Sequence, residues 1–387
     1  MNFPTNQQKK NTMKETTLPN PTEEKPHAQQ FDPAKLEALA GHVLTEIGAA
    51  ANASLVQSGY ELGLFDKLSE NGPMTAGELA ASISGNERHL REWLSSQYTS
   101  GMIDYDDTTD KFSLTPEQEM VLVNRDSPVY LGGSWYGVAS MYHGIDAITR
   151  SMQTGEGVAW GDQCSCLFCS TAEFYRPAYQ NALLSEWIPA LEGVHLKLES
   201  GANTLDIGCG YGHSTAILAG AFPKSRFTGL DLHESSIEEA RKIAVEAGAS
   251  NAYFEAGDAR TFTGNRYDLV TMFDAFHDMG NPVEIARHIR EELLVEGGTL
   301  MIVEPRAGDT LSENKNPMGR AFYAFSTAFC TANALSQLND DTRATAHNAL
   351  GAQAGEARLS SVLREAGFSQ IRRAADSIEL MVLEAKA

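Results

Sequence analysis

The sequence predicts an α/β fold: a doubly wound, mostly parallel sheet whose last strand is antiparallel, preceded by a mainly helical winged-helix domain. Two observations predict it. From Asn203 onward, apolar runs alternate with helical patterns, which is the rhythm of a parallel sheet. Before that, residues 74–115 show a helix, a turn, a second helix and two short strands, which is the pattern of a winged helix. A chain of 387 residues is long enough for both domains.

The strands of the predicted sheet are five apolar runs, followed by two more near the end of the chain. The five runs are "NTLDIG", "RFTGLDL", "NAYFEAGD", "YDLVTMFDA" and "GGTLMIVEP". The final stretch, "FSQIRRAADSIELMVLEAKA", holds two strand-like runs with a turn between them. We therefore expect the last strand to enter antiparallel beside its neighbour.

Composition divides the chain into four segments. Residues 1–30 are polar and Pro-rich, which predicts a disordered leader. Residues 31–125 form the helical winged-helix domain, and residues 126–198 form a helical connector whose many aromatic residues are suited to wall a pocket. Residues 199–387 hold the sheet, with a helical insertion at 311–354 that is expected to act as a lid over the carboxyl edge of the strands.

The charge of the chain argues against nucleic-acid and anionic-membrane partners. The net charge is −21, whereas proteins that bind such partners usually carry clusters of Lys and Arg. The winged-helix domain alone holds fifteen acidic and six basic residues, so it would repel a phosphate backbone. No stretch is apolar for long enough to cross a membrane, and the N-terminal segment lacks the apolar core of a secretory signal. We expect a cytoplasmic protein with no nucleic-acid or membrane partner.

The stretch "TLDIGCGYGHST" follows the first strand and places glycines at 208, 210 and 212. Glycines at this point let the backbone approach a ligand closely. A dinucleotide-binding loop has the pattern GxGxxG, but His213 stands where its third glycine belongs. The acidic Asp206 before the loop is poorly placed for a pyrophosphate and well placed for a ligand with an ammonium and a sulfonium group. S-adenosylmethionine carries both.

Two further carboxylates follow the next two strands. Asp231 ends "FTGLDL", where a carboxylate can accept hydrogen bonds from both hydroxyls of a ribose. Asp258 follows in "EAGDAR", where it can accept from an adenine amino group. Together with Asp206, these residues at three consecutive strand ends predict S-adenosylmethionine as the cofactor.

With these motifs, residues 203–387 resemble a class I S-adenosylmethionine-dependent methyltransferase with a Rossmann-like sheet. The region before them resembles the dimerisation domain of small-molecule O-methyltransferases. The chain also resembles a bacterial methyltransferase group, uncharacterised as to substrate, that is marked by "HDMG" and "NPMGRAFY" stretches. The resemblance implies a homodimer that methylates a small molecule. It implies a cofactor site made of Asp206, Gly208, Gly210, Gly212, Asp231, Leu232, Asp258, Ala259, Phe273 and Asp274.

Methyl transfer to a hydroxyl group requires a base, and "MFDAFHDMGNP" after the fourth strand offers His277 and Asp278. In plant-type phenolic O-methyltransferases a His-Asp pair stands here, which implies His277 as general base, although Met279 replaces the usual Trp. The alternative is that His277 only packs near a helix start and that Asp278 stabilises that helix. In the insertion, Arg320 and Tyr323 are candidates for substrate contacts.

The stretch "CSCLFC" places Cys164, Cys166 and Cys169 within six residues. An odd total of five cysteines without regular spacing predicts reduced thiols, so the three are candidate ligands for zinc or a soft metalloid. They leave open a second function, the methylation of a metalloid such as arsenite or of a thiol. A third, from another class, is a regulator that senses S-adenosylmethionine through the sheet and contacts DNA through the winged helix.

Overall fold

The computed structural model describes residues 31–339, 342, 348–377 and 379–386, so the predicted disordered leader lies outside the described residues. The chain divides into two compact units, residues 1–48 and residues 49–387. Helix α1 (Pro33–Glu61) contributes to both. The winged helix, the connector and the sheet all belong to the second unit.

The winged helix forms as predicted, because its helices begin at strong capping residues. Thr75 caps α3 (Ala76–Ile83) in a capping box with Glu78, and the Asn86 side chain caps α4 (Glu87–Thr99). The domain also contains α2 (Leu64–Asn71), the antiparallel strands β1 (Asp104–Asp106) and β2 (Lys111–Ser113), and α5 (Pro116–Leu122).

The connector is helical and packs against the sheet. It contains α6 (Ser134–His143), α7 (Ile145–Thr154), η1 (Trp160–Asp162), α8 (Ser165–Ala178), η2 (Tyr179–Trp187), α9 (Ile188–Ala190) and α10 (Val194–Ser200). Tyr179 and Trp187 are buried in the same core as the sheet residue Phe273, and the rings of Tyr179 and Phe273 are 5.3 Å apart. The connector aromatics therefore pack on the sheet.

The sheet has seven strands in the order β5-β4-β3-β6-β7-β9-β8. They are β3 (Asn203–Ile207), β4 (Arg226–Asp231), β5 (Ala252–Ala256), β6 (Tyr267–Phe273), β7 (Leu294–Pro305), β8 (Gln370–Asp376) and β9 (Leu380–Lys386). The first five pair in parallel, and β9 lies antiparallel between β7 and β8. This confirms the predicted doubly wound sheet with an antiparallel last strand.

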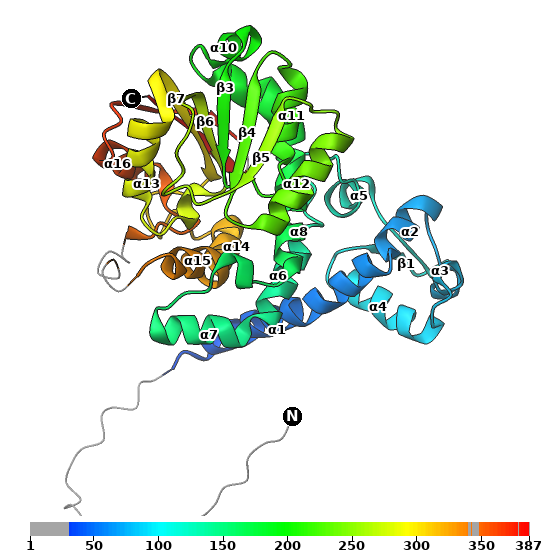
Figure 1. Ribbon diagram of the computed structural model, residues 1–387. Coiled ribbons are helices and arrows are strands. Elements are labelled where there is room, and N and C mark those ends of the chain that lie inside the picture. Colours follow the sequence, from blue (N-terminus) through cyan, green and yellow to red (C-terminus); the bar gives the residue numbers. More distant parts are fainter. Residues whose placement is uncertain (1–30, 340–341, 343–347, 378, 387) are drawn as a thin grey trace, which may run out of the picture. The chain divides into compact units, whose positions relative to one another are not determined.

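Helices cover both faces of the sheet, as Figure 1 shows. One core joins the sheet to α11 (His213–Ala221), α12 (Glu234–Glu246) and the connector. The other joins it to α13 (Pro282–His288), η4 (Ile289–Leu293) and α16 (Gly355–Glu365). Because both faces are buried, the central strands read as continuous apolar runs rather than as alternating ones.

The helical insertion follows β7 and packs at the carboxyl ends of the strands. Its helices are α14 (Pro317–Phe325), η5 (Ser326–Cys330) and α15 (Thr331–Ser336). Gln337 donates a hydrogen bond to the carbonyl of Asp278 over 2.9 Å, and Asn333 accepts one from the backbone of Trp160 over 3.0 Å. Part of the predicted lid, residues 340–341 and 343–347, lies outside the described residues.

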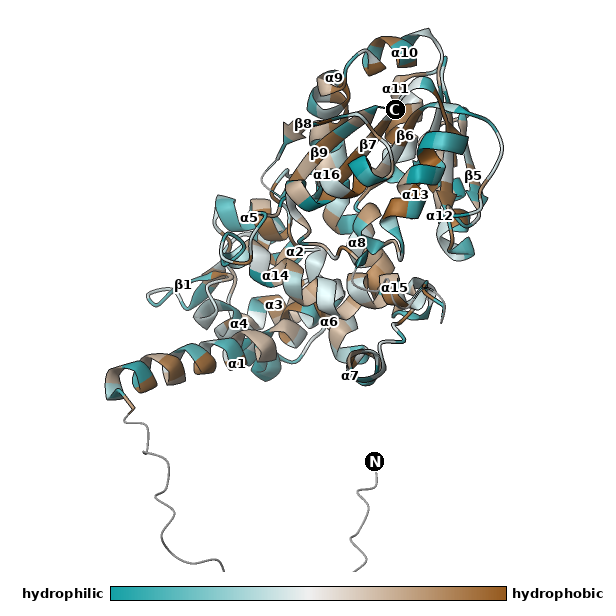
Figure 2. Cartoon of the chain, turned by 90° about the vertical axis from the view of Figure 1, so that its left-hand side faces the viewer, coloured by the Kyte–Doolittle hydropathy of each residue, from teal (hydrophilic) through white to brown (hydrophobic). Residues whose placement is uncertain are grey.

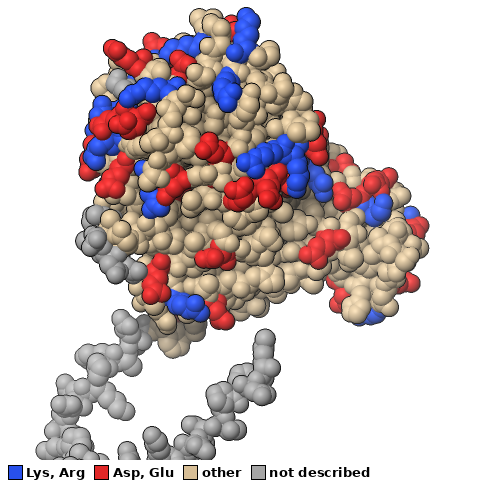
Figure 3. Space-filling view, in the orientation of Figure 1, with Lys and Arg blue, Asp and Glu red and all other residues tan. Residues whose placement is uncertain are grey.

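None of the helices described is both long and apolar enough to cross a membrane. On the face drawn in Figure 3, acidic and basic side chains are interspersed over the surface. This face therefore has no broad basic surface of the kind that binds a nucleic acid.

Candidate active site

A cavity of about 480 Å³ lies at the carboxyl ends of the parallel strands, where a doubly wound sheet binds its ligands. The glycine loop, α8, the ends of β4 and β6 and the insertion all contribute to its lining. Of the predicted site residues, nine line it together: Gly208, Gly210, Gly212, Asp231, Leu232, Asp258, Ala259, Phe273 and Asp274. Asp278 lines it as well.

The glycine loop needs glycine for steric reasons at two positions. Gly208 has φ +70°, and a Cβ there would lie 2.6 Å from the side chain of Ala275. Gly212 has φ +73°, and a Cβ there would lie 2.5 Å from the ring of Phe254. Any side chain at either position would displace the loop from the cavity floor.

Asp206 lies below this loop and does not line the cavity. Its carboxylate accepts hydrogen bonds from Ser214 (2.9 Å), Thr215 (2.5 Å) and Thr271 (2.9 Å). Burial raises its pKa to about 6, although these three hydroxyls act in the opposite direction. In this structure Asp206 joins β3, β6 and α11, and its oxygens are engaged within the protein.

Asp231 and Asp258 both line the cavity, but their carboxylates have different partners. Asp231 accepts hydrogen bonds from the backbone amides of Gly210 and His233, both over 2.9 Å, which fixes its carboxylate at the strand end. Arg260, a residue that the sequence did not point to, donates from Nε to Oδ1 and from Nη2 to Oδ2 of Asp258 and so forms a bidentate ion pair. The Arg260 side chain holds the pKa of Asp258 below its usual value.

Asp274 is a mostly buried carboxylate of the cavity lining. It has φ +51°, a left-handed conformation that is uncommon outside glycine and tends to occur at functional sites. Its Oδ1 atom is buried without a hydrogen-bond partner. Burial raises the pKa of Asp274 to about 8, with a further contribution from Glu304 and an opposing one from His277. A cation in the cavity would favour its ionised form.

His277 lies behind the cavity wall, with only 1% of the residue exposed. Its Nδ1 atom is 2.5 Å from Oε2 of Glu304, and its Nε2 atom is 3.2 Å from Oδ1 of Asp278. Burial disfavours the charged imidazole, but Glu304 and Asp278 outweigh burial, so the pKa of His277 is well above its usual value. The structure thus brings His277 and Asp278 together, with Asp278 facing the cavity.

Glu304 is a functional candidate that the sequence reasoning missed. It stands near the end of β7, only 2% exposed, and its Oε1 atom accepts hydrogen bonds from the backbone amides of Phe276 and His277. The available signal was a charged residue inside the apolar run "LMIVEP", because a carboxylate is seldom buried without a partner.

Arg320 and Tyr323 are not among the residues that line the cavity. Both lie on exposed positions of α14, and Tyr323 is 36% exposed. In this conformation a substrate in the cavity would not reach them without a movement of the insertion.

The expectation of three reduced thiols is wrong for two of them. Cys164 and Cys166 form a disulfide, which their Cα–Cα distance of 5.3 Å allows. Cys169 is free and exposed, with its sulfur 3.9 Å from the Tyr211 hydroxyl. Disulfide sulfurs do not offer thiolate ligands, so the three cysteines are not a set of metal ligands in this state.

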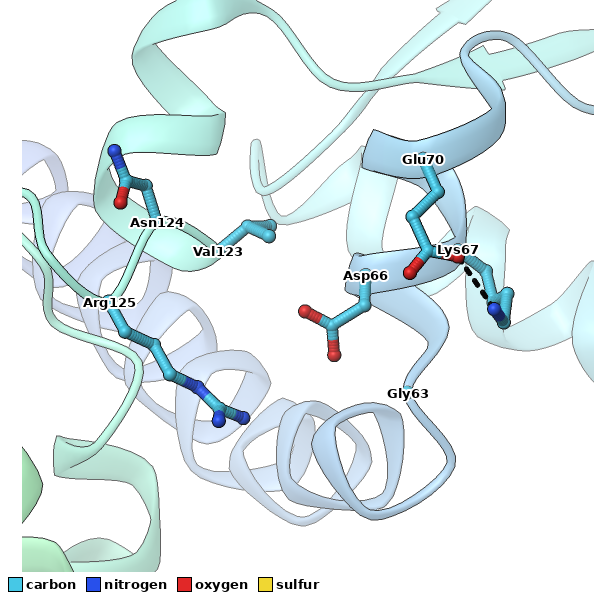
Figure 4. A pocket seen from close by; sticks show the side chains of 7 residues that line it. All are labelled: Gly63, Asp66, Lys67, Glu70, Val123, Asn124 and Arg125. Carbon is cyan, nitrogen blue, oxygen red and sulfur yellow. Dashed lines mark hydrogen bonds and ion pairs between the residues drawn. The ribbon is translucent and has the colours of Figure 1, made fainter. Parts of the chain in front are cut away.

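A second hollow, of about 600 Å³, lies between α2 and the segment that follows α5. Asp66 and Arg125 point into it from opposite sides, and Lys67 pairs with Glu70 at its rim (Figure 4). It is open to solvent and lies away from the strand ends. The cavity at the sheet edge is therefore the candidate active site.

Comparison with known proteins identifies two domains in the chain. A family profile described as "Methyltransferase domain" matches residues 198–367, and one described as "Rv2258c-like winged HTH domain" matches residues 50–124. A protein-L-isoaspartate O-methyltransferase of Dictyoglomus turgidum is 33% identical over 126 residues, which cover 32% of this chain and 53% of that protein. The chain thus spans about half the length of this curated relative.

Two solved structures resemble almost the whole chain. A putative O-methyltransferase of Nostoc punctiforme has a TM-score of 0.66 at 20% identity, covering 93% of this chain and 100% of that one. Human N-acetylserotonin methyltransferase, solved in complex with S-adenosylmethionine, has a TM-score of 0.65 at 15% identity, covering 93% and 99%. At 15–20% sequence identity, the structural similarity shows only that the fold is shared. The family profiles identify the two domains. The chain therefore contains a methyltransferase domain at residues 198–367, preceded by a winged helix-turn-helix domain at residues 50–124, on the fold of the methyltransferases named above.

Proposed function

We propose that the protein transfers the methyl group of S-adenosylmethionine to a hydroxyl group of a small molecule. The observation that carries this proposal is the buried group of His277, Asp278 and Glu304, which reaches the cavity through Asp278. Such a group can accept the proton that a hydroxyl loses when its oxygen is methylated. The names of the Nostoc and Dictyoglomus proteins, both O-methyltransferases, support the same acceptor atom.

The cofactor would lie along the glycine loop. The Asp231 carboxylate, held by two backbone amides, suits the ribose hydroxyls, and the loop glycines leave room for the chain between ribose and sulfur. Leu232, Asp258 and Ala259 would surround the adenine. Asp274, a carboxylate in a dry part of the cavity, suits the positively charged end of the cofactor.

In the proposed reaction the acceptor oxygen forms a bond to the methyl carbon while the bond from that carbon to sulfur breaks. The sulfonium takes the bonding electron pair and becomes a neutral thioether, and the hydroxyl proton passes to Asp278. The His277 ring, held at Nδ1 by Glu304, stabilises the pair that receives this proton. The cavity aligns the acceptor with the methyl group, which lowers the entropic part of the barrier.

The acceptor is proposed to be aromatic. Trp160, Phe168, Tyr175 and Tyr179 all line the cavity, and the rings of Trp160 and Phe168 are 5.7 Å apart. Aromatic side chains of this kind pack well against a flat ring.

Transfer of labelled methyl from S-adenosylmethionine to a panel of phenols, carboxylates, thiols and arsenite tests the proposal. Metal-independent turnover on phenols is the expected result. Turnover on arsenite or a thiol alone would contradict the proposal and favour metalloid or thiol methylation by the cysteine cluster. In that event, replacing Cys164, Cys166 and Cys169 by serine should abolish turnover while cofactor binding persists.

Cofactor affinity is expected to rise with pH because of Asp274. Its carboxyl group has a pKa of about 8 in the free protein, so below pH 8 it must lose a proton before it can pair with a cation. Affinity should therefore fall by up to about tenfold per pH unit below 8. Calorimetric titrations from pH 6 to 9 measure this. The Asp274→Asn variant controls for titration of the cofactor itself, and an equal slope in both proteins would contradict the role of Asp274.

The N-terminal helix is proposed to pair two copies of the chain. Leu36, Leu39, Val43 and Ile47 recur at helical spacing on α1 and are 53%, 60%, 47% and 60% exposed. Figure 2 shows these apolar stretches along the helix. An apolar stripe of this length is costly to leave in water, and two-fold dimers are the commonest assembly.

Charge in this stripe is expected to separate the dimer. A Leu39→Glu and Val43→Glu double variant should elute as a monomer, because two carboxylates would be buried on association. Light scattering coupled to size exclusion measures the mass. The Lys35→Glu variant adds negative charge to the same helix outside the stripe and should stay dimeric. A monomeric parent chain would contradict the proposal.

A further inference from the structure

A half-buried cysteine, Cys330, lies beside the proposed proton-accepting pair and has no part in the mechanism above. A ring nitrogen of His277, a carboxylate oxygen of Asp278 and Sγ of Cys330 all lie within 4.8 Å of one another. Cys330 comes from η5 of the insertion, and the other two come from the short helix η3 (Phe276–Asp278) after β6. An imidazole, a carboxylate and a thiol are each ligands of zinc.

The imidazole is oriented as a metal ligand would be. Its Nδ1 atom faces Glu304 at 2.5 Å, and Glu304 is itself held by two backbone amides. A carboxylate that pairs with one ring nitrogen orients the ring, so that the other nitrogen can bind a metal once its proton is displaced. In His277 that other nitrogen is Nε2, which lies 3.2 Å from Oδ1 of Asp278.

The distance between the first two donor atoms fits a shared ion. Two nitrogen or oxygen ligands at 2.0–2.2 Å from a tetrahedral zinc ion lie about 3.3 Å apart. His277 Nε2 and Asp278 Oδ1 are 3.2 Å apart, yet Asp278 Oδ1 is buried and makes no well-formed hydrogen bond. The spacing of this pair is therefore already close to the spacing that a shared zinc ion requires.

The second cluster of donor atoms in the described residues does not fit. Asp274, His277 and Glu304 also bring their donors within 4.8 Å of one another. The distance of 2.5 Å from His277 Nδ1 to Glu304 is that of a shared proton and is too short for two ligands of one zinc ion.

We propose that His277 Nε2, Asp278 Oδ1 and Cys330 Sγ form a zinc-binding site. Three protein ligands leave the fourth tetrahedral position free, and Asp278 lines the cavity, so an ion can enter from there. The mixed set of nitrogen, oxygen and sulfur donors favours zinc over magnesium or calcium, which prefer oxygen alone.

Zinc at this site inhibits methyl transfer, a consequence that rests on the proposed function. The ion would bind Oδ1 of Asp278, so that Asp278 could no longer receive the proton of the acceptor. On binding, zinc displaces the proton of the Cys330 thiol and the proton on Nε2 of His277 to solvent, with no change of oxidation state.

Cobalt(II) is the spectroscopic probe for the site. The full-length protein is used with Cys164, Cys166 and Cys169 replaced by serine, so that the cysteine cluster cannot bind the ion. We expect one equivalent of cobalt to give a thiolate-to-cobalt charge-transfer band that zinc abolishes by displacement. In this background Cys330→Ser should remove the band and raise the dissociation constant for zinc by about 100-fold.

Cys209→Ser is the matched control, since Cys209 is the other cysteine that remains in this background, and it is buried. It should keep the band. Cys330→Ala is a second variant, and calorimetric binding of S-adenosylmethionine reports whether each variant is folded. Absence of the band in the parent background, or its survival in a folded Cys330 variant, would overturn the site.

An activity assay with zinc distinguishes failure of the zinc site from failure of the proposed function. Micromolar zinc should inhibit methyl transfer by the parent, while Cys330→Ser should keep its activity and become insensitive to zinc. Zinc inhibition that is equal in both proteins would contradict the site. If none of the acceptors is methylated, the proposed function fails, and the cobalt spectrum still decides whether the site exists.

Discussion

Replacing His277 by alanine is expected to slow methyl transfer by about 10²–10⁴-fold, the usual contribution of general acid–base catalysis, because Asp278 then loses the ring that stabilises it as proton acceptor. Cofactor affinity should stay nearly unchanged, because His277 does not line the cavity. The measurement is kcat on the best phenolic acceptor, together with calorimetric titration of S-adenosylmethionine. An unchanged kcat would remove His277 from the mechanism.

Glu304→Gln distinguishes a positioning role from a structural one. Glutamine keeps the shape and can accept the same backbone hydrogen bonds, but it removes the charge beside His277 Nδ1. Because that charge helps to raise the pKa of His277, the pH profile of kcat should shift to lower pH in this variant. A variant that merely loses stability would keep the profile of the parent.

Replacing Asp231 by alanine is expected to weaken cofactor binding by roughly 100-fold, or about 3 kcal/mol, since hydrogen bonds to a charged group are worth more than neutral ones. The loss has two parts. The ribose hydroxyls lose their acceptor, and the amides of Gly210 and His233 lose the carboxylate that holds the loop. Calorimetry with S-adenosylhomocysteine, which cannot react, measures the change.

Asp258→Asn is the comparison for this variant. Asp258 already shares its charge with Arg260, so its contribution to ligand binding is expected to be smaller than that of Asp231. A larger loss in Asp258→Asn than in Asp231→Ala would contradict the proposed placement of the ribose.

The fold was predictable because its determinants are local. Capping residues such as Thr75 and Asn86 mark helix starts in the sequence, and burial on both sides makes the central strands read as apolar runs. The glycines at 208 and 212 mark the loop for the same reason, since each is required by its own backbone angle and close neighbour.

The side chains of the site were less predictable, because a position near a strand end does not tell where a side chain points. Asp231 is the last residue of β4 and faces the cavity, whereas Asp206 stands one residue before the end of β3 and points to buried hydroxyls. Successive strand residues point to opposite faces, so a shift of one position changes the surroundings completely.

Contacts between segments that are far apart in the sequence could not be predicted from sequence patterns. Glu304 lies 27 residues from His277 in the sequence, and Cys330 belongs to η5, a helix of the insertion. Nothing local in "NPMGRAFY" or "STAFC" indicates that the insertion would bring a thiol to the loop after β6. The disulfide of Cys164 and Cys166 was likewise hidden by the odd number of cysteines.

The place of β9 affects the order in which the protein can be completed on the ribosome. Strand β8 leaves the ribosome before β9, but β9 lies between β7 and β8, so the sheet cannot close until the later strand has been made. Glu304 of β7 stands opposite Met381 of β9. The carboxylate that holds His277 is therefore fixed late in synthesis, and a nascent chain can fold its glycine loop before its proton-accepting group is assembled.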